Sequence, residues 1–148
     1  MNDVQSAFKR NKLILYSLVL AFFGFLDAAY LTILHYKNII PPCSLQGCEK
    51  VLTNTYSMVG PIPVALLGVI FYLIVILTCL VILIEGMKSL LEFFHFTVAA
   101  GFLFSAVLFF IQFSILHSFC QYCLLSEIIS TGIFVLSLLK FREDRKLK

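Results

Sequence analysis

The sequence predicts an all-α membrane protein, a bundle of four transmembrane helices with one extracytoplasmic loop between helices 1 and 2. The first reason is composition, because 61% of the 148 residues are hydrophobic and 13% are charged, with a mean hydropathy of +1.01. The second is length. A hydrocarbon core about 30 Å thick needs roughly 20 apolar residues in a helix, and four such windows occur, at residues 13–36, 61–84, 93–116 and 120–139. We expect residues 1–148 to form one integral membrane domain.

The four windows differ in the titratable residues they contain. The first is interrupted only by Asp27, the second has no charge, the third has His95 near its edge and the fourth contains Glu127. Basic residues precede the first window, as they would in a signal peptide. Its apolar run is far longer than the roughly 7–15 residues of a signal h-region, so we expect an uncleaved helix. Residues 37–60 form the one sizeable loop and contain a short surface helix, indicated by the spacing of Val51, Leu52 and Thr55.

The distribution of Lys and Arg predicts the orientation of the chain. Basic residues flank the bundle at both ends, namely Lys9, Arg10 and Lys12 before the first helix and Lys140, Arg142, Arg145, Lys146 and Lys148 after the fourth. Both termini are therefore expected in the cytoplasm, and the membrane is expected to be a bacterial inner or plasma membrane. The net charge of +3 comes largely from these tails, so it concerns topology and gives no reason to expect a nucleic-acid partner.

Four of the five cysteines gather at one face of the predicted bundle. Cys43 and Cys48 lie in the loop, and Cys120 and Cys123 begin the fourth helix. With the termini in the cytoplasm, all four face the extracytoplasmic side, where disulfides persist. The fifth, Cys79, lies within the second window and is expected to be a small buried hydrophobic residue.

Three interpretations of the four cysteines compete. A structural staple would brace the loop, and four cysteines allow three pairings among which the sequence does not choose. A zinc site would use four thiolates, but the loop spacing is Cys-x4-Cys and the compartment is oxidising, so we expect no metal. Redox chemistry is favoured by the position of Cys120 and Cys123, because the unpaired N–H groups and positive dipole of a helix N-terminus stabilise a thiolate. A bridge within one helical turn would also constrain almost nothing.

The fourth helix carries a polar stripe that continues from this pair. Residues three or four apart share a helix face, and the stripe consists of Cys120, Cys123, Ser126, Glu127, Ser130 and Thr131. Such a stripe should face the interior of a membrane bundle. Cys123 would lie about one turn deeper than Cys120, at a site open to a hydrophobic redox partner such as a membrane quinone. The loop pair, in "PPCSLQGC", is suited to exchange with a soluble partner, because thiol–disulfide exchange requires an accessible sulfur.

In these features the chain resembles the vitamin K epoxide reductase family, specifically its small microbial members. The features that match are the loop cysteines with "CEKVL" and Tyr56-Ser57 after them, "GPIPVALLG" opening the second helix, "FCQYCLLS" opening the fourth, and "GFLDAAYLT" in the first. They cover residues 13–139, and their order is more specific than any one of them.

The resemblance implies a four-helix bundle around a quinone, with electrons passing inward by thiol–disulfide exchange. Carried over by position, Cys43 would meet a thioredoxin-like partner and Cys48 would pass electrons to Cys120. Cys123 would be the thiolate beside the quinone ring. Some members carry a fused thioredoxin-like domain, whereas this chain ends at Lys148 without one, so a separate partner is expected.

The chain departs from the family pattern at two positions. Asn54 stands where a Ser is expected two residues before Tyr56, and its amide could still bond a quinone oxygen. Glu127 stands where the vertebrate branch has a Tyr, which argues against vitamin K epoxide as the substrate. The candidate quinone-binding or proton-relay residues are Asn54, Tyr72, Asp27 and Glu127.

The sequence thus predicts a thiol:quinone oxidoreductase that reoxidises a DsbA-like partner and reduces ubiquinone or menaquinone. The nearest competing enzyme class is a Dsb-type quinone reductase, but there the quinone-linked Cys-x-x-Cys lies in the first outer loop. Two competing functions stay open beside these: a non-enzymatic membrane protein with a braced outer loop, and a chain that delivers reducing equivalents outward.

Overall fold

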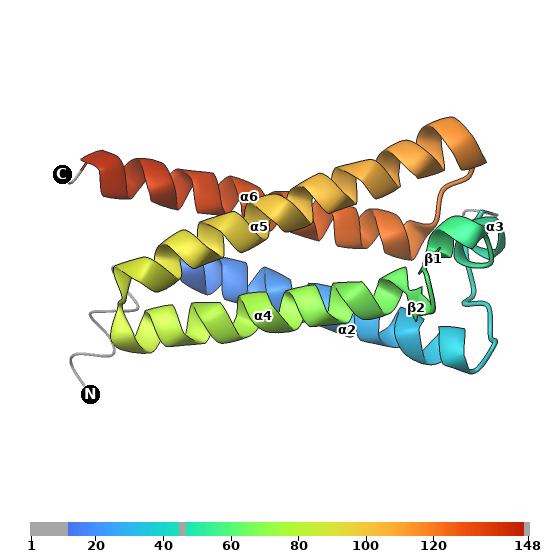
Figure 1. Cartoon of the computed structure of the whole chain (residues 1–148), viewed down its shortest axis with the longest axis horizontal. Helices are drawn as coiled ribbons and strands as arrows, with labels where there is room; N and C mark the ends of the chain where they lie inside the picture. The colour runs from blue at the N-terminus through green and yellow to red at the C-terminus, as the bar shows by residue number, and fades with distance from the viewer. Residues whose placement is uncertain (1–11, 45–46, 147–148) are drawn as a thin grey trace.

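The computed structural model describes residues 12–44 and 47–146. Four long helices make up the bundle: α2 (Lys12–Tyr36), α4 (Val64–Glu85), α5 (Lys88–Phe110) and α6 (Gln121–Lys146) (Figure 1). The chain of α5 continues into η2, a π-helix (Ile111–Leu116), and with that extension all four are long and apolar enough to cross a membrane. The predicted all-α four-helix membrane bundle is confirmed.

Two helix boundaries differ from the apolar windows for reasons of backbone chemistry. The helix expected from residue 61 begins at Val64, because the chain is still extended at Pro63, the residue before it, and proline donates no backbone hydrogen bond. The helix expected to end at 139 continues to Lys146. Its polar end is supported by Lys140, whose Nζ lies 3.0 Å from Asp144 Oδ1 one turn further on.

The third helix also begins earlier than its apolar window. Gly86 ends α4 in a left-handed conformation with φ 65°, and its N–H donates to Ile82 O, as is common at helix C-termini. The turn is then complete within Gly86 and Met87, so α5 begins at Lys88 and not at residue 93.

The loop between α2 and α4 contains more structure than the single predicted helix. It holds α3 (Cys48–Leu52), η1 (Thr55–Ser57) and a two-stranded antiparallel hairpin of β1 (Met58–Val59) and β2 (Ile62–Pro63). The register pairs Met58 with Pro63 and Val59 with Ile62. The short helix therefore begins at Cys48 and ends before Thr55, earlier than its spacing indicated. Strands of two residues are too short to show an alternating pattern in the sequence.

Helices α2 and α4 pack closely because α2 presents small residues to its neighbour. A buried face of α2 consists of Ser17, Ala21, Gly24 and Ala28. A Cβ added at Gly24 would collide with the ring of Tyr72 on α4, and one added at Gly68 would lie 3.3 Å from Ala28 Cβ. Lipid gives helices little hydrophobic reason to associate, so close packing of small residues is a main source of helix–helix stability in membranes.

The helices place the basic ends and the loop at opposite ends of the bundle. The start of α2 and the end of α6 lie at one end, and α3, the hairpin and the α5–α6 turn lie at the other (Figure 1). The four predicted site cysteines belong to the loop end, while Cys79 is fully buried within α4.

We expect Gly24→Ala to destabilise the bundle by about 1–3 kcal/mol, because the added methyl group overlaps the buried Tyr72 ring. Thermal unfolding in detergent measures the effect. Gly132→Ala is the matched control, since its Cβ would meet only the flexible end of Leu20 at 3.3 Å. Equal melting temperatures for the two variants would contradict the proposed role of the α2–α4 contact.

Candidate active site

The loop cysteines form a disulfide. Cys43 and Cys48 are bridged, with their Cα atoms 6.1 Å apart, which selects the pairing that the sequence left open. Cys48 is the first residue of α3 and is buried, whereas Cys43 is half-buried. Within the described chain Cys120 and Cys123 are free thiols. The site therefore consists of an outer disulfide (Cys43–Cys48) and an inner dithiol (Cys120 and Cys123).

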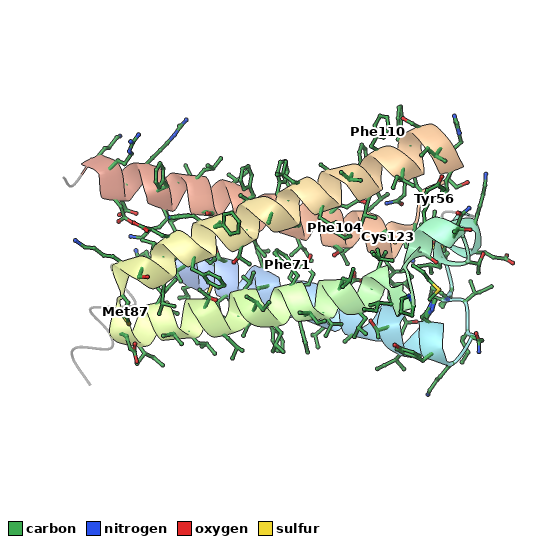
Figure 2. The ribbon with its side chains drawn as sticks, in the orientation of Figure 1. Tyr56, Phe71, Met87, Phe104, Phe110 and Cys123 are labelled. Carbon is green, nitrogen blue, oxygen red and sulfur yellow. A yellow bond between two sulfur atoms is a disulfide. The ribbon has the colours of Figure 1, made fainter. Side chains whose placement is uncertain are left out.

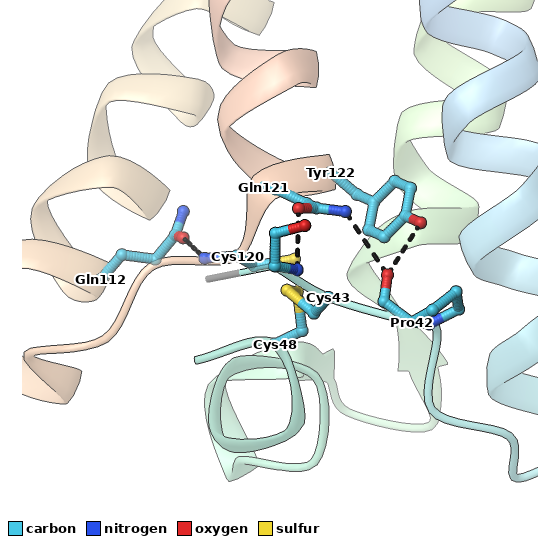
Figure 3. Close-up of a disulfide and its surroundings, with 8 residues drawn as sticks. Pro42, Cys43, Cys48, Gln112, Cys120, Gln121 and Tyr122 are labelled. Carbon is cyan, nitrogen blue, oxygen red and sulfur yellow. Dashed lines mark hydrogen bonds between the residues drawn. A yellow bond between two sulfur atoms is a disulfide. The ribbon is translucent and has the colours of Figure 1, made fainter. Parts of the chain in front are cut away.

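Backbone packing brings the outer disulfide to the inner dithiol. A Cβ added at Gly47 would lie 2.6 Å from Phe119 O and 2.8 Å from Phe119 N. Gly47 precedes Cys48 and Phe119 precedes Cys120, so this contact makes the two cysteines neighbours (Figure 3). Lys50 adds a second attachment by donating from Nζ to Leu116 O at 2.6 Å.

The two residues between the inner cysteines hold the other flank of the loop. Tyr122 donates its hydroxyl to Pro42 O at 3.1 Å. Gln121 Nε2 donates to the same carbonyl at 3.4 Å, and Gln121 Oε1 accepts from Ser44 N at 3.1 Å (Figure 3). Both bonded loop residues are direct neighbours of Cys43. Gln121 and Tyr122, the two residues between the inner cysteines, therefore hold the loop on both sides of Cys43 and so position the outer disulfide.

Cys120 stands just before α6, which corrects the expectation that it is the first residue within that helix. Its carbonyl accepts the N–H of Leu124 at 2.9 Å, so it is the last residue before the helix. A hydrogen bond from the Cys123 side chain lowers the pKa of Cys120, and the N–H groups of Cys123 and Tyr122 lower it further against the opposing effect of burial. This is the stabilisation expected at a helix N-terminus, and it favours the thiolate at Cys120.

A large, mainly apolar and partly open cavity of about 920 Å³ lies among the helices and is lined by Cys123 of the inner dithiol. Cys123, Ser126, Glu127 and Ser130 all line it, which places most of the predicted polar stripe in the interior. Thr131 is an exception. It is exposed and its hydroxyl donates to Glu127 O. Cys123 and Tyr56 lie toward the loop end of the bundle, and Phe71 and Phe104, which also line the cavity, lie further along it (Figure 2).

The four residues predicted to contact a quinone or move protons all line this cavity. Tyr72 donates to Ser126, whose O and Oγ each lie 2.9 Å from the hydroxyl. Asp27 Oδ2 and Glu127 Oε2 are buried and have no hydrogen-bond partner among residues 12–44 and 47–146. Asn54 Oδ1 accepts from Tyr56 N at 3.3 Å, which leaves the amide NH2 as the group that can donate into the cavity.

Gln112 is a site residue that the sequence patterns did not single out. It is 3% exposed, and its Oε1 accepts from Cys120 N at 3.2 Å while its Nε2 donates to Glu127 Oε1 at 2.6 Å. Polar sites within the apolar windows were indicated by titratable side chains, and the uncharged amide of Gln112 gives no such signal. Gln112 lies 18 residues, five full turns of 3.6, from the buried Phe94, so a search for polar residues on the buried face of α5 could have found it.

The residues that line the cavity fit a quinone. Most of its walls are apolar, as a membrane-soluble ring and tail require. Unpartnered carboxyl oxygens of Asp27 and Glu127 supply groups able to bond carbonyl or hydroxyl oxygens. Cys123 supplies a sulfur at the same cavity.

The fold and the site together define an integral membrane protein of the thiol-redox class. They combine four apolar helices, a disulfide on the loop and a dithiol beside a cavity. Consistent with this, the model of the Vitamin K epoxide reductase family matches residues 15–138, and the chain belongs to that family. Its members are membrane thiol oxidoreductases, linked in general to quinones and to thioredoxin-like partners. A comparison with curated proteins found no match.

We expect Gly47→Ala to separate Cys48 from Cys120, because the new methyl group would overlap the Phe119 backbone. In a Cys43→Ala/Cys123→Ala background, mild oxidation should trap a Cys48–Cys120 disulfide, and Gly47→Ala should slow that trapping about tenfold. Mass spectrometry of digested protein measures the product. Glu49→Ala, an exposed change in the helix that Gly47 precedes, is the control, and equal trapping rates in the two variants would contradict the contact.

We expect the Cys120 thiolate to form at a pH below the ordinary cysteine range, because its hydrogen bonds lower its pKa. In a Cys79→Ala background with the outer disulfide intact, ultraviolet thiolate absorbance should rise with pH through a transition below about 8.5. Cys123→Ala removes the largest lowering contribution and should move the transition upward, whereas Cys123→Ser keeps a donor and should move it less. A transition at one pH in all three proteins would contradict this assignment.

Proposed function

We propose that this protein is a thiol:quinone oxidoreductase that reoxidises an extracytoplasmic thioredoxin-like protein of the DsbA type. Electrons pass through the two cysteine pairs to ubiquinone or menaquinone and so support disulfide formation. The observation that carries the proposal is the juxtaposition of the two pairs. Gly47, next to Cys48 of the outer disulfide, packs against the backbone of Phe119, next to Cys120, and Cys123 of the inner dithiol lines the apolar cavity.

The outer step is an exchange at Cys43. A thiolate of the reduced partner attacks the Cys43 sulfur, the Cys43–Cys48 bond breaks and Cys48 leaves as a thiolate. The second thiol of the partner then displaces Cys43, so the partner gains a disulfide and the outer pair gains two electrons and two protons. The greater exposure of Cys43 than of Cys48 supports this assignment, because attack requires access.

The transfer between the pairs is a second exchange. The Cys48 thiolate attacks Cys120 of an oxidised inner pair and releases Cys123, and Cys43 then displaces Cys120. The outer disulfide forms again as the inner one is reduced. An outer disulfide with an inner dithiol is the product of this step, and it is the combination that the structure contains.

The last step reoxidises the inner pair at the cavity. A quinone bound there supplies an acceptor for two electrons and two protons. As the Cys120–Cys123 bond forms, two electrons and two protons leave the two thiols. A proton passed from Cys123 to Cys120 would move the thiolate to Cys123, the sulfur that lines the cavity.

Four polar residues would orient the quinone and handle its protons in this proposal. Glu127 and Asp27 both line the cavity and would pass protons from the thiols to the acceptor. Each has one buried carboxyl oxygen that bonds no other described residue. Tyr72 would hold Ser126 in place through their hydrogen bond. Asn54 would donate its amide N–H to a quinone oxygen. The same proposal places residues 1–148 in one domain, with cytoplasmic termini and the cysteine site on the extracytoplasmic face.

The test is anaerobic mixing of the purified protein, a reduced thioredoxin-like partner and a quinone, with quinol formation followed spectroscopically. We expect the wild-type protein to form quinol and Cys123→Ala to fall to the rate without protein, because no inner disulfide can form. Cys79→Ala, which changes a buried thiol of α4 away from the cavity, should retain the wild-type rate. Full activity of Cys123→Ala, or no quinol from the wild-type protein, would overturn the proposal.

A further inference from the structure

The side chain of Gln112 bridges the inner dithiol and the carboxyl group of Glu127. We infer that Gln112 is a positioning residue: it occupies Oε1 of Glu127, so that the proton of this cavity-lining carboxyl group is held on Oε2, the oxygen that Gln112 does not bond. This inference rests on the proposed thiol:quinone activity and names a further residue that the reaction requires.

The hydrogen bonds determine the orientation of the Gln112 amide. A backbone N–H can only donate, so the Gln112 atom 3.2 Å from Cys120 N must be the carbonyl oxygen. The amide NH2 therefore has to face Glu127, and it lies 2.6 Å from Oε1. The reversed orientation would place the amide NH2 against the Cys120 N–H, so that two donors would face each other, and it is therefore excluded.

This orientation decides where Glu127 can carry a proton. Oε1 accepts a hydrogen bond from Gln112 Nε2. A proton on Oε1 that pointed toward Gln112 would face the amide N–H, and two donors would then meet. The remaining oxygen, Oε2, is buried and bonds nothing in the part of the chain that the structure describes, while Glu127 lines the cavity together with Cys123. An unpartnered buried oxygen is costly, and a bound acceptor that takes a hydrogen bond from Oε2 would remove that cost.

Gln112 is itself held firmly enough to position another group. It belongs to the π-helix η2, a kind of irregularity frequent at functional sites, and its backbone O accepts from Ser118 N at 3.3 Å and from His117 N. Its side chain is buried and crosses from the end of α5 to the first turns of α6. One residue thus contacts both the cysteine that changes redox state and the carboxyl group that would supply the proton.

Other titratable groups line the same cavity, so a test must distinguish their effects on the rate from the effect of Glu127. Asp27 reaches it from α2, Tyr72 from α4 and Cys123 from α6, and Cys120 adjoins Gln112 directly. A change in rate or in its pH profile is therefore not specific by itself. A double-mutant cycle is specific, because it asks whether Gln112 acts through Glu127.

The first experiment compares Gln112→Leu, Glu127→Gln and the double variant in both half-reactions. We expect Gln112→Leu to slow quinol formation about tenfold, a fraction of what general acid catalysis supplies, while oxidation of the thioredoxin-like partner keeps its rate. The double variant should be no slower than Glu127→Gln alone. Additive losses, or equal slowing of both half-reactions, would show a merely structural role and overturn the inference. Thr78→Val, a buried polar-to-apolar change in α4 that bonds only within its own helix, is the control and should keep both rates.

The second experiment needs no quinone and so separates this inference from the proposed function. Infrared spectroscopy at acid pH should show a carboxylic acid C=O band that Glu127→Gln removes. We expect Gln112→Leu to shift that band to higher frequency, because the carbonyl oxygen Oε1 loses its hydrogen bond. Gln112→Asn, one methylene shorter and unable to reach both partners, should shift it too and serves if the Leu variant does not fold. An unshifted band would overturn the inference, whereas a shifted band in a protein that forms no quinol would overturn only the proposed function.

Discussion

The contact between Gly47 and the backbone of Phe119 is the constraint on which the site depends. Any side chain larger than hydrogen at Gly47 would hold the loop away from the start of α6. The contact joins two segments separated by about half of the chain and leaves Cys48 and Cys120 as neighbours. Thiol–disulfide exchange needs sulfur atoms in direct contact. In the proposed reaction, this backbone contact would therefore determine whether the outer and inner cysteine pairs can exchange disulfides.

The start of α6 organises three other interactions around that contact. Gln121 and Tyr122 hold the loop on one side, the helix N-terminus and Cys123 stabilise the Cys120 thiolate, and Gln112 connects Cys120 to Glu127. The stretch "SFCQYC" therefore serves two purposes in the proposed function: the cysteines would carry the chemistry, and Gln121 and Tyr122 between them bind the loop. A Cys-x-x-Cys pattern alone would indicate the chemistry of the cysteines and not the attachment of the loop.

The bundle and its cysteines were predictable because their signals are local. Long uncharged windows identify spanning helices, and the carboxyl groups of Asp27 and Glu127 within them indicate an interior polar site. The contacts that complete the site were not predictable in the same way. Gly47 and Phe119 meet across about half of the chain, and the bridge from Gln112 depends on how α5 continues into a π-helix. The hairpin at Met58 to Pro63 is two residues per strand, below what any periodicity can show.

The cavity extends along α4 and α5, where Ile70, Phe96 and Phe104 line it and are also exposed on the outer surface of the bundle. In a bilayer that surface meets acyl chains and not water. For a quinone-reducing protein, the acceptor would then arrive by lateral diffusion within the leaflet, without first dissolving in the aqueous phase. Saturation of the cavity with quinone would then depend on the mole fraction of quinone in the lipid. Such a protein would turn over at different rates in membranes of different quinone content, even at equal bulk quinone concentrations.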